Sequence, residues 1–284
     1  MIPELSVQQG SVSASEPESL EPVLAAVRET IGLDFSGYRT ATVRRRVRNR
    51  MLRVGAGSIA EYLDLVRTST DEALRLAETI TIKVSRFYRN RSVFDRFRHD
   101  LLPALAMDRP RLAIWVAGCG CGEEAYTYAM LLEESGIQGT VVATDIDVFA
   151  LAAAERAEYP IVSIAELPSD LAAKFLTPLG DNRVAVTADV RDRVRFGRHD
   201  VIAAAAPPGP GTFAIVSCRN VLIYFQRSAQ VVAFALLRRA LEAGGVLVLG
   251  EAEWPAPSEA DAFDIVSQRS RIFRARAGPD GRRA

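Results

Sequence analysis

Apolar residues recur at different spacings in the two halves of this chain. Between about residues 21 and 98 they return every three or four positions, which places them on one face of a helix. This region is therefore predicted to be all-helical. The expected helices cover residues 22–31, 41–54, 58–66, 71–82 and 92–105.

Beyond Pro110 the pattern changes to short apolar runs, typical of strands buried on both faces, which alternate with helical spacing. This alternation predicts the α/β class, with a doubly wound, Rossmann-like parallel sheet. Pro110 disfavours helix at the residue before it, so a domain boundary is expected near residues 100–110. The expected strands are 112–116, 140–143, 194–196, 212–217 and 246–249, and the helices are 124–135, 148–156, 169–175 and 228–241.

The pattern divides the chain into two domains and two tails. Residues 1–19 and 277–284 lack periodicity and are expected to be flexible. Residues 20–100 form the helical domain and residues 101–276 the sheet domain. Because residues 159–194 are too many for a plain loop, they are expected to form a small appended subdomain.

The first strand of the sheet runs into a turn with three alternating glycines. Gly118, Gly120 and Gly122 let the backbone bend sharply and let a ligand lie against bare peptide groups. The dinucleotide-binding fingerprint requires a third glycine where Glu123 stands. Glu123 and Glu124 would repel a pyrophosphate at the helix start but suit a cationic, ribose-containing cofactor such as S-adenosylmethionine. A tight turn followed by a solvated acidic helix start is the alternative.

Other polar residues follow the predicted strands, where doubly wound sheets bind their ligands. Asp145, 25 residues beyond Gly120, is predicted to accept both ribose hydroxyls, or else to cap the next helix. Arg219 and Asn220 follow the fourth strand, with Tyr224 close behind as a site residue or a core residue. Arg89 lies between the domains and could clamp a substrate carboxylate or brace the interface.

Charge is balanced overall but concentrated locally. With 35 basic and 35 acidic side chains, the net charge gives no general attraction to nucleic acid or to membranes. Residues 36–53, however, contain seven arginines and no acidic residue. The apolar stripe of Val43, Val47 and Met51 leaves most of the arginines on exposed faces. They are predicted to dock an acidic partner, a protein helix or a nucleic acid, unless they only solvate the helix.

The remaining composition argues against several classes of protein. Three cysteines without a spaced framework indicate a reducing compartment, and with only two histidines no metal site is predicted. Residues 1–20 do not resemble a signal peptide, and no apolar run reaches the roughly 18 residues of a membrane span. The protein is expected to be a cytoplasmic monomer.

Five ordered motifs after the arginine-rich helix carry a family resemblance. They are IKVSRFYRN at 82–90, GCGCGEEAY at 118–126, ATDID at 143–147, SCRNVLIYF at 217–225 and LGEAE at 249–253. This set resembles the chemotaxis-receptor methyltransferases of the CheR type, over about residues 20–275. The resemblance implies methyl esterification of glutamate side chains on the cytoplasmic helices of chemoreceptors, with S-adenosylmethionine as cofactor and S-adenosylhomocysteine as product.

The resemblance also implies roles for individual residues. Arg89 and Tyr224 match the pair near the transferring methyl group. The implied cofactor contacts are Lys83, Ser85, Arg89, Gly118, Glu124, Asp145, Asp200, Val201, Arg219 and Asn220. The arginines expected to dock the receptor are Arg44, Arg45, Arg46, Arg48, Arg50 and Arg53.

Three positions depart from the family's pattern. Lys83 stands where asparagine is frequent, the turn is richer in cysteine, and His199-Asp200-Val201 matches its motif loosely. Residues 176–182 lack the glycine-rich loop associated with docking a receptor's C-terminal pentapeptide, so no such tether is expected. The alternatives are a non-catalytic module that binds the cofactor and a nucleic-acid methyltransferase. The latter is disfavoured because Cys218-Arg219-Asn220 stands in place of its Pro-Pro-aromatic motif.

Overall fold

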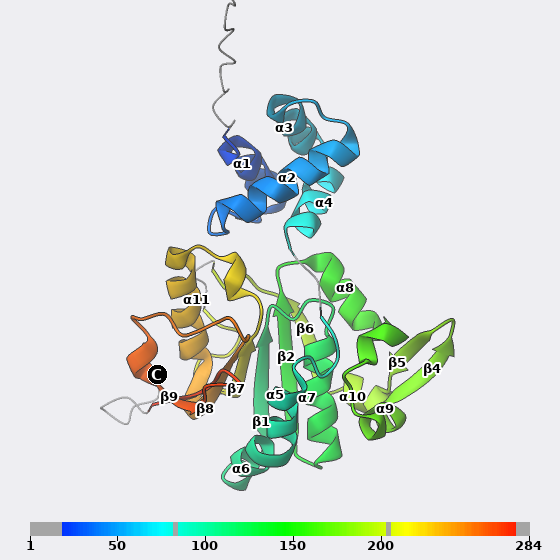
Figure 1. Ribbon diagram of the computed structural model, residues 1–284, viewed down its shortest axis with the longest axis vertical. Helices are drawn as coiled ribbons and strands as arrows, with labels where there is room; N and C mark the ends of the chain where they lie inside the picture. Colours follow the sequence, from blue (N-terminus) through cyan, green and yellow to red (C-terminus); the bar gives the residue numbers. More distant parts are fainter. Residues whose placement is uncertain (1–18, 82–84, 203–205, 277–284) are drawn as a thin grey trace, which may run out of the picture.

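The computed structural model describes residues 19–81, 85–202 and 206–276. Most of the two expected tails, and Lys83, lie outside these residues. Figure 1 shows a helical part above a larger part built around a sheet. Within the described residues no helix combines the length and the apolar character needed to cross a membrane.

Residues 19–81 contain four helices, which correspond to the first four expected from the apolar spacing. They are α1 (Glu21–Ile31), α2 (Thr40–Val54), α3 (Ile59–Thr68) and α4 (Thr70–Ile80). Ser58 and Ser69 cap α3 and α4 by accepting backbone N–H groups, which helix starts leave unpaired. On α2, Val43 and Val47 are buried, and this apolar stripe holds the arginine-rich helix against the others.

The next helical stretch belongs to the sheet rather than to the helical part. It comprises α5 (Arg91–Arg96), the π-helical turn η1 (Phe97–Leu101) and α6 (Leu102–Met107). Phe94 and Phe97 share a buried cluster with Ile114 of the first strand. The division between the two parts therefore falls between Ile80 and Arg91, and the boundary expected near residues 100–110 is corrected.

Seven strands form the main sheet in the order β6-β2-β1-β7-β8-β10-β9. Each strand pairs in parallel with its neighbours except β10, which is antiparallel to both β8 and β9. Their bounds are β1 (Leu112–Ala117), β2 (Gly139–Asp145), β6 (Val194–Arg198), β7 (Phe213–Cys218), β8 (Leu241–Leu249), β9 (Phe263–Ser267) and β10 (Ile272–Ala275). The strand order reverses between β1 and β7, which is where such sheets bind ligands.

Strands β9 and β10 were not predicted. At this edge of the sheet Phe263 is buried while Ile265 is 60% exposed, so the short run carries no continuous apolar signal. The expected parallel sheet is confirmed, with β10 as a reversed strand that was not predicted.

Helices cover the sheet, and a second small sheet lies beside it (Figure 1). The covering helices include α7 (Glu123–Glu134), α8 (Val148–Arg156), α10 (Ala188–Arg191) and α11 (Arg227–Ala240). The small sheet has the order β3-β5-β4. Its elements are β3 (Glu158–Pro160), η2 (Ile161–Ile164), α9 (Ser169–Phe175), β4 (Leu176–Gly180) and β5 (Arg183–Val186), within the region expected to form an appended subdomain.

The hydrophobic core lies on both faces of the sheet. One buried cluster joins α5, α6 and α7 to β1. The other contains Trp115 of β1, Phe234 of α11 and Val47 of α2, so it continues from the sheet into the helical part. The two parts of the chain are thus packed against each other through a shared core.

Candidate active site

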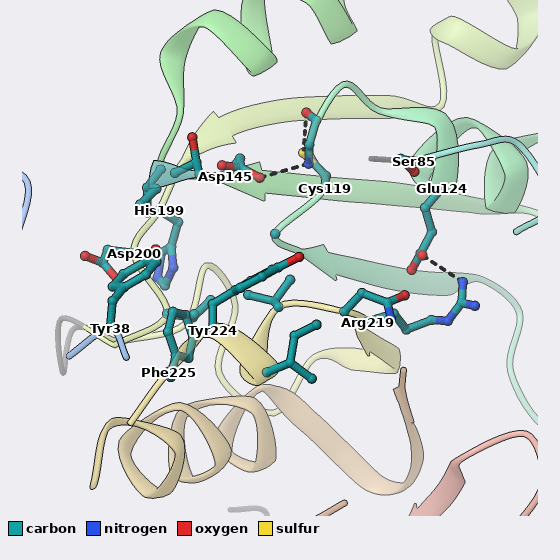
Figure 2. Close-up of a pocket in the computed structure, with 18 of the residues that line it drawn as sticks. Tyr38, Ser85, Cys119, Glu124, Asp145, His199, Asp200, Arg219, Tyr224 and Phe225 are labelled. Atoms are coloured by element: carbon teal, nitrogen blue, oxygen red, sulfur yellow. Dashed lines mark hydrogen bonds and ion pairs between the residues drawn. The ribbon is translucent and has the colours of Figure 1, made fainter. Parts of the chain in front are cut away.

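A cavity of about 210 Å³ opens at the point where the strand order reverses. Both parts of the chain line it, and Figure 2 shows its side chains converging from the ends of the strands. Every expected cofactor or catalytic residue within the described ranges lies on its wall. These residues are Ser85, Arg89, Gly118, Glu124, Asp145, Asp200, Val201, Arg219, Asn220 and Tyr224.

The glycine turn forms the floor of the cavity between β1 and α7. Gly118 adopts a left-handed φ of 73°, and a Cβ atom there would lie 2.4 Å from the Val221 side chain. Only glycine therefore lets the turn approach the segment after β7. The next glycine, Gly120, directs its N–H toward β2, where it donates to Asp145 at 2.8 Å.

Asp145 is held at the end of β2 by backbone donors. Its Oδ2 accepts from Gly120 and its Oδ1 accepts from the N–H of Asp147 at 2.9 Å. Burial raises the pKa of the Asp145 carboxyl. The alternative role of helix cap is filled by Asp147 instead, which accepts from Phe149 and Ala150 at the start of α8. Asp145 is thus left to line the cavity.

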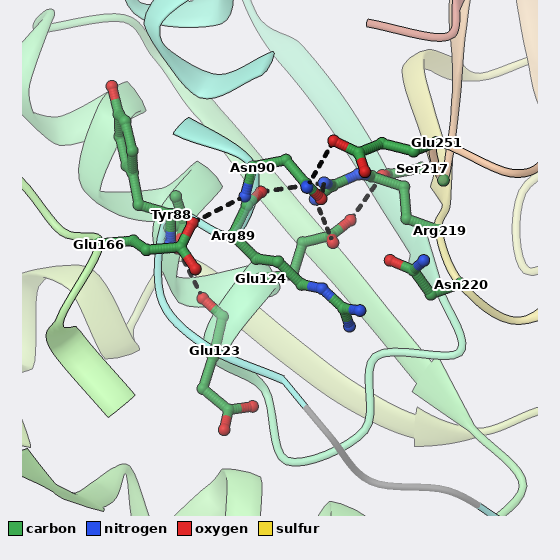
Figure 3. A network of polar contacts seen from close by, with 12 residues as sticks. Tyr88, Arg89, Asn90, Glu123, Glu124, Glu166, Ser217, Arg219, Asn220 and Glu251 are labelled. Atoms are coloured by element: carbon green, nitrogen blue, oxygen red, sulfur yellow. Dashed lines mark hydrogen bonds and ion pairs between the residues drawn. The ribbon is translucent and has the colours of Figure 1, made fainter. Parts of the chain in front are cut away.

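Glu124 and Arg219 form a buried ion pair at the opposite end of the cavity (Figure 3). The Arg219 side chain is 1% exposed, and its Nη1 lies 2.8 Å from Glu124 Oε2. Glu124 Oε1 accepts from the Ser217 hydroxyl at 2.5 Å. Arg219 Nη2 also donates to the carbonyl oxygen of Arg89 and to Asn90 Oδ1. This network ties the start of α7 and the end of β7 to the segment that carries Arg89.

Glu123 does not line the cavity, although both Glu123 and Glu124 were expected from the sequence to face the cofactor. Only Glu124 of the two adjacent carboxylates lines the cavity, and Figure 3 shows the two side chains pointing in different directions. Glu123 is 6% exposed, and burial raises the pKa of its carboxyl. The acidic groups that a cationic cofactor would meet are therefore Glu124, which Arg219 already pairs, and Asp145.

Asn220 lines the cavity and carries a buried side-chain oxygen that lacks a partner in the part of the chain that the structure describes. Its φ is 60°, a left-handed conformation stabilised by the buried carboxylate of Glu253, which accepts the Asn220 N–H at 2.9 Å. The same carboxylate accepts the N–H groups of Gly250 and Ile223. Asn220 Oδ1 is buried and has no hydrogen-bond partner among the described residues. A buried acceptor of this kind fits a ligand with N–H donors.

Arg89 and Tyr224 come from two different segments and meet at the cavity. Arg89 is half-buried, and its backbone is fixed by Arg219. Tyr224 is also half-buried, so it is not a simple core residue, and its hydroxyl is directed into the cavity (Figure 2). The structure therefore brings together the pair that the resemblance places near the methyl group.

Several lining residues were missed by the sequence analysis. They include Tyr38, Ile80 and Thr81 of the helical part, together with Cys119, Ile146, His199, Val221, Ile223 and Phe225. Most are apolar residues directly next to a predicted one in the sequence, so including one position to either side of each predicted residue finds them. Tyr38 carries no such signal, because it lies 80 residues before the glycine turn and reaches the cavity only through tertiary packing.

The arginine-rich helix presents a mixed surface. Arg45, Arg48 and Arg53 are exposed, whereas Arg44 and Arg46 are half-buried. Arg50 differs from them, because it donates to both carboxylate oxygens of Glu72 on α4, at 2.7 and 2.6 Å. A carboxylate from another helix thus compensates this arginine, which the composition of the α2 region alone did not reveal.

Comparison with known protein families identifies the family of this chain. Residues 83–272 match the family described as CheR methyltransferase, SAM binding domain, and residues 18–81 match the CheR methyltransferase all-alpha domain. The chain belongs to the CheR methyltransferase family. Its sheet part is therefore an S-adenosylmethionine-binding domain, and the boundary between the matches agrees with the division seen in the core.

Individual relatives agree with this assignment. The chain is 32% identical over 235 residues to a chemotaxis protein methyltransferase of Listeria monocytogenes, covering 80% of this chain and 86% of that protein. It is 30% identical over 243 residues to chemotaxis protein methyltransferase 1 of Pseudomonas aeruginosa, covering 80% and 86%. An uncharacterised 104.1 kDa protein of Rhodobacter capsulatus is 31% identical over 286 residues, but this chain spans only 30% of its length.

The residues of the cavity fit the cofactor of this CheR domain. The sulfonium and ammonium groups of S-adenosylmethionine are cationic, and its ribose carries two hydroxyl donors. Asp145 offers carboxylate oxygens at one end, and the unpaired Asn220 Oδ1 offers an acceptor near the other. The cavity wall thus includes a carboxylate and an amide oxygen, acceptor types that suit a ligand with hydroxyl and ammonium donors.

Proposed function

We propose that this chain transfers methyl groups from S-adenosylmethionine to glutamate side chains on acidic helices of a chemoreceptor's cytoplasmic domain. The observation that supports this proposal best is the meeting of Arg89 and Tyr224 in the same cavity as Asp145 and Asn220. A cation and a hydroxyl beside a cofactor site suit a carboxylate acceptor. The exposed arginines of α2 offer a complementary surface for the acidic helix that carries it.

The residues that would hold the cofactor have distinct tasks. Asp145 would accept the ribose hydroxyls, and Asn220 would accept from the ammonium group. Glu124, Arg219 and Ser217 fix one another and so preorganise that end of the cavity. When bound, S-adenosylmethionine supplies a methyl group on a positively charged sulfur, and the products are a methyl ester and S-adenosylhomocysteine.

The protein needs no general base for this reaction. A glutamate with an ordinary pKa of about 4.3 is already ionised at neutral pH. Removing water from that carboxylate is costly unless another group replaces the lost hydrogen bonds. Arg89 would replace them and orient the reacting oxygen, while Tyr224 would donate a hydrogen bond or shape the path to the methyl group.

Labelled methyl transfer tests the proposed function. Purified receptor cytoplasmic fragments are incubated with the protein and methyl-labelled S-adenosylmethionine, and alkali-labile label is measured. We expect incorporation into the native fragment and none into a matched fragment whose candidate glutamates are replaced by alanine. Cofactor binding without any alkali-labile product would favour a non-catalytic module that binds the cofactor. Label on nucleic acid bases would favour a nucleic-acid methyltransferase.

Replacing Arg89 with alanine separates catalysis from cofactor binding. We expect turnover to fall about 100-fold or more, because positioning of the acceptor is lost. The dissociation constant of S-adenosylhomocysteine should change by less than about fivefold, since the proposed contact is with the acceptor. Calorimetric titration and the label assay measure the two quantities. Unchanged turnover would remove Arg89 from the catalytic role.

Receptor recognition is proposed to need no pentapeptide tether. Strands β4 and β5 are joined by Asp181 and Asn182, whose φ angles of 46° and 55° are typical of a tight hairpin turn. Such a turn leaves no extended loop to receive a peptide. A fluorescent receptor C-terminal pentapeptide should therefore not bind at micromolar concentration. Saturable micromolar binding would contradict this expectation.

A further inference from the structure

The helical part of the chain supplies one wall of the cofactor cavity through Tyr38. This residue lies in the segment before α2 and is 8% exposed. Its ring packs edge-on against Phe225 at a centroid distance of 5.0 Å and against Phe35 at 5.1 Å. Tyr38 and Phe225 line the cavity, whereas Phe35 is not among the described residues on its wall. The aromatic cluster therefore reaches the cavity through only part of its surface.

Backbone hydrogen bonds hold Tyr38 in this place. The N–H of Arg39 donates to the carbonyl oxygen of Tyr224, and the N–H of Gln226 donates to that of Gly37, both at 2.8 Å. The side-chain amide of Gln226 also donates to the Tyr38 carbonyl oxygen at 2.9 Å. Tyr38 and Phe225 thereby form an isolated antiparallel bridge. An aromatic ring held this firmly loses little further freedom when a ligand packs against it.

Tyr38 lies at the same end of the cavity as Asp145, the residue proposed to bind the ribose. Figure 2 shows Tyr38, His199, Asp200 and Phe225 together, opposite the end with Glu124 and Arg219. Burial and the negative charges of Asp200, Asp145 and Asp147 raise the pKa of the Tyr38 hydroxyl. The ring therefore shares its surroundings with Asp145, the residue proposed to bind the ribose.

We propose that Tyr38 is a further cofactor-binding residue, which packs against the adenosine moiety of S-adenosylmethionine and makes the helical part a component of the cofactor site. Aromatic side chains bind nucleobases by stacking, and losing one such ring commonly weakens binding about tenfold. The inference rests on cofactor binding at this cavity and is independent of the methyl acceptor. It concerns only binding, so a failure of receptor methylation would leave it untouched.

The binding of S-adenosylhomocysteine to the full chain, measured by calorimetric titration, tests this role. We expect Tyr38→Leu to raise the dissociation constant about tenfold and Tyr38→Phe to change it less than about threefold, because the ring and not the hydroxyl makes the contact. Phe35→Leu is the matched control, since it removes a buried ring from the same cluster away from the cavity wall. It should leave the constant within about twofold.

A nucleoside ligand without the amino acid group sharpens the test. Tyr38→Leu should weaken 5′-methylthioadenosine and S-adenosylhomocysteine by the same factor, whereas Asn220→Ala should weaken only the latter. Wild-type affinity in Tyr38→Leu, or an equal loss in Phe35→Leu, would overturn the proposal. A loss confined to S-adenosylhomocysteine in Tyr38→Leu would also overturn it.

Hydrogen exchange of the wild-type protein provides a test without any substitution. Saturating S-adenosylhomocysteine should slow exchange in peptides that cover residues 36–40 and 224–226, because the ligand would stabilise the contacts between them. Peptides from α3, none of whose residues lines the cavity, serve as the internal control and should slow less, because only the global stabilisation by the ligand protects them. Unchanged exchange at residues 36–40 under saturating ligand would contradict the role of Tyr38.

Discussion

At the scale of single residues, Arg219 is the charged group on which the order of the site depends most. It is almost fully buried and contacts Glu124, Asn90 and the Arg89 backbone. Its guanidinium also lies over the Phe94 ring, 5.2 Å from the centroid. Removing such a partner leaves the opposite charge buried without compensation, which is costlier than losing the pair altogether.

The variant Arg219→Met should therefore lower the free energy of unfolding by about 3–5 kcal/mol. The double variant Glu124→Gln/Arg219→Met should recover part of this loss, because no uncompensated charge remains. Urea denaturation of the wild type, both single variants and the double variant measures the coupling. Equal losses in Arg219→Met and in the double variant would show that packing, and not the buried Glu124 charge, determines the cost.

Asp200 provides a pH-dependent prediction at the same scale. Burial raises the pKa of its carboxyl, so the folded protein holds this proton more tightly than the unfolded chain does. The stability it contributes is present below the ordinary pKa of 3.8 and is lost as pH rises through the folded-state value. Asparagine keeps the acceptor for the Ile202 N–H without this loss.

Relative to wild type, Asp200→Asn should therefore gain stability between pH 3.5 and pH 7, measured as the difference in urea midpoints. Asp34 is the control with opposite sign, because hydrogen bonds from Ser36 lower the pKa of its carboxyl. Asp34→Asn should lose stability relative to wild type over the same range. A pH-independent difference for Asp200→Asn would contradict the burial argument.

At the scale of elements, α2 combines exposed arginines, which are proposed to dock an acidic helix, with a structural ion pair. Exposed Arg45, Arg48 and Arg53 have room to meet an acidic helix, whereas Arg50 holds α2 to α4 through Glu72. The Tyr62 hydroxyl donates to the same Glu72 carboxylate. Identical residue types on one helix therefore have different tasks, which only their exposure and partners distinguish.

Replacing Arg45, Arg48 and Arg53 together with glutamine should raise the KM for a receptor fragment about tenfold and reduce its salt dependence. The melting temperature and the affinity for S-adenosylhomocysteine should stay near wild type, because exposed charges contribute little to stability. Arg50→Gln is the contrasting variant, since it should destabilise the protein by leaving Glu72 buried without its partner. An unchanged KM in the triple variant would refute docking through α2.

Elements with a strong repeating signal could be predicted from the sequence, and those without it could not. The apolar stripe of α2 and the buried run of β1 are continuous, so both elements lie where expected. Strands β9 and β10 are short, and β9 is mostly exposed or half-exposed. Strand β10 pairs with the edge of β8 and β9 pairs with β10, which no local pattern encodes. The helix at Arg91–Met107 was recognised, but its packing partner was not.

At the scale of the whole molecule, the same distinction explains which residues of the site could be predicted from the sequence. Residues next to a strand end, such as Asp145 and Asn220, could be predicted because parallel strands bring their ends together. Tyr38 could not, since it enters through contacts between segments nearly 190 positions apart in the chain. Glu123 was misjudged because adjacent helical residues point in different directions, which only the packing of α7 resolves.

The shared core also predicts how the whole protein unfolds. One buried cluster runs from α2 and α4 to β1 and α11, and polar contacts such as Thr81–Asp147 add to the interface. We therefore expect a single calorimetric transition, with equal calorimetric and van't Hoff enthalpies. S-adenosylhomocysteine at 100 times its dissociation constant should stabilise the protein by about 2.7 kcal/mol and shift that transition as a whole.

Two transitions, of which the ligand shifts only one, would show that the helical part unfolds independently of the cofactor site. Residues of the helical part and residues of the sheet part would then unfold at different temperatures, and the ligand would raise only one of these temperatures. Trp115 in β1 and Tyr62 in α3 lie on opposite sides and are both fully buried. The spectroscopic signals of both residues should change at one common temperature, and the ligand should raise that temperature equally for both, because Tyr38 and Thr81 place the helical part on the wall of the cavity that the ligand fills.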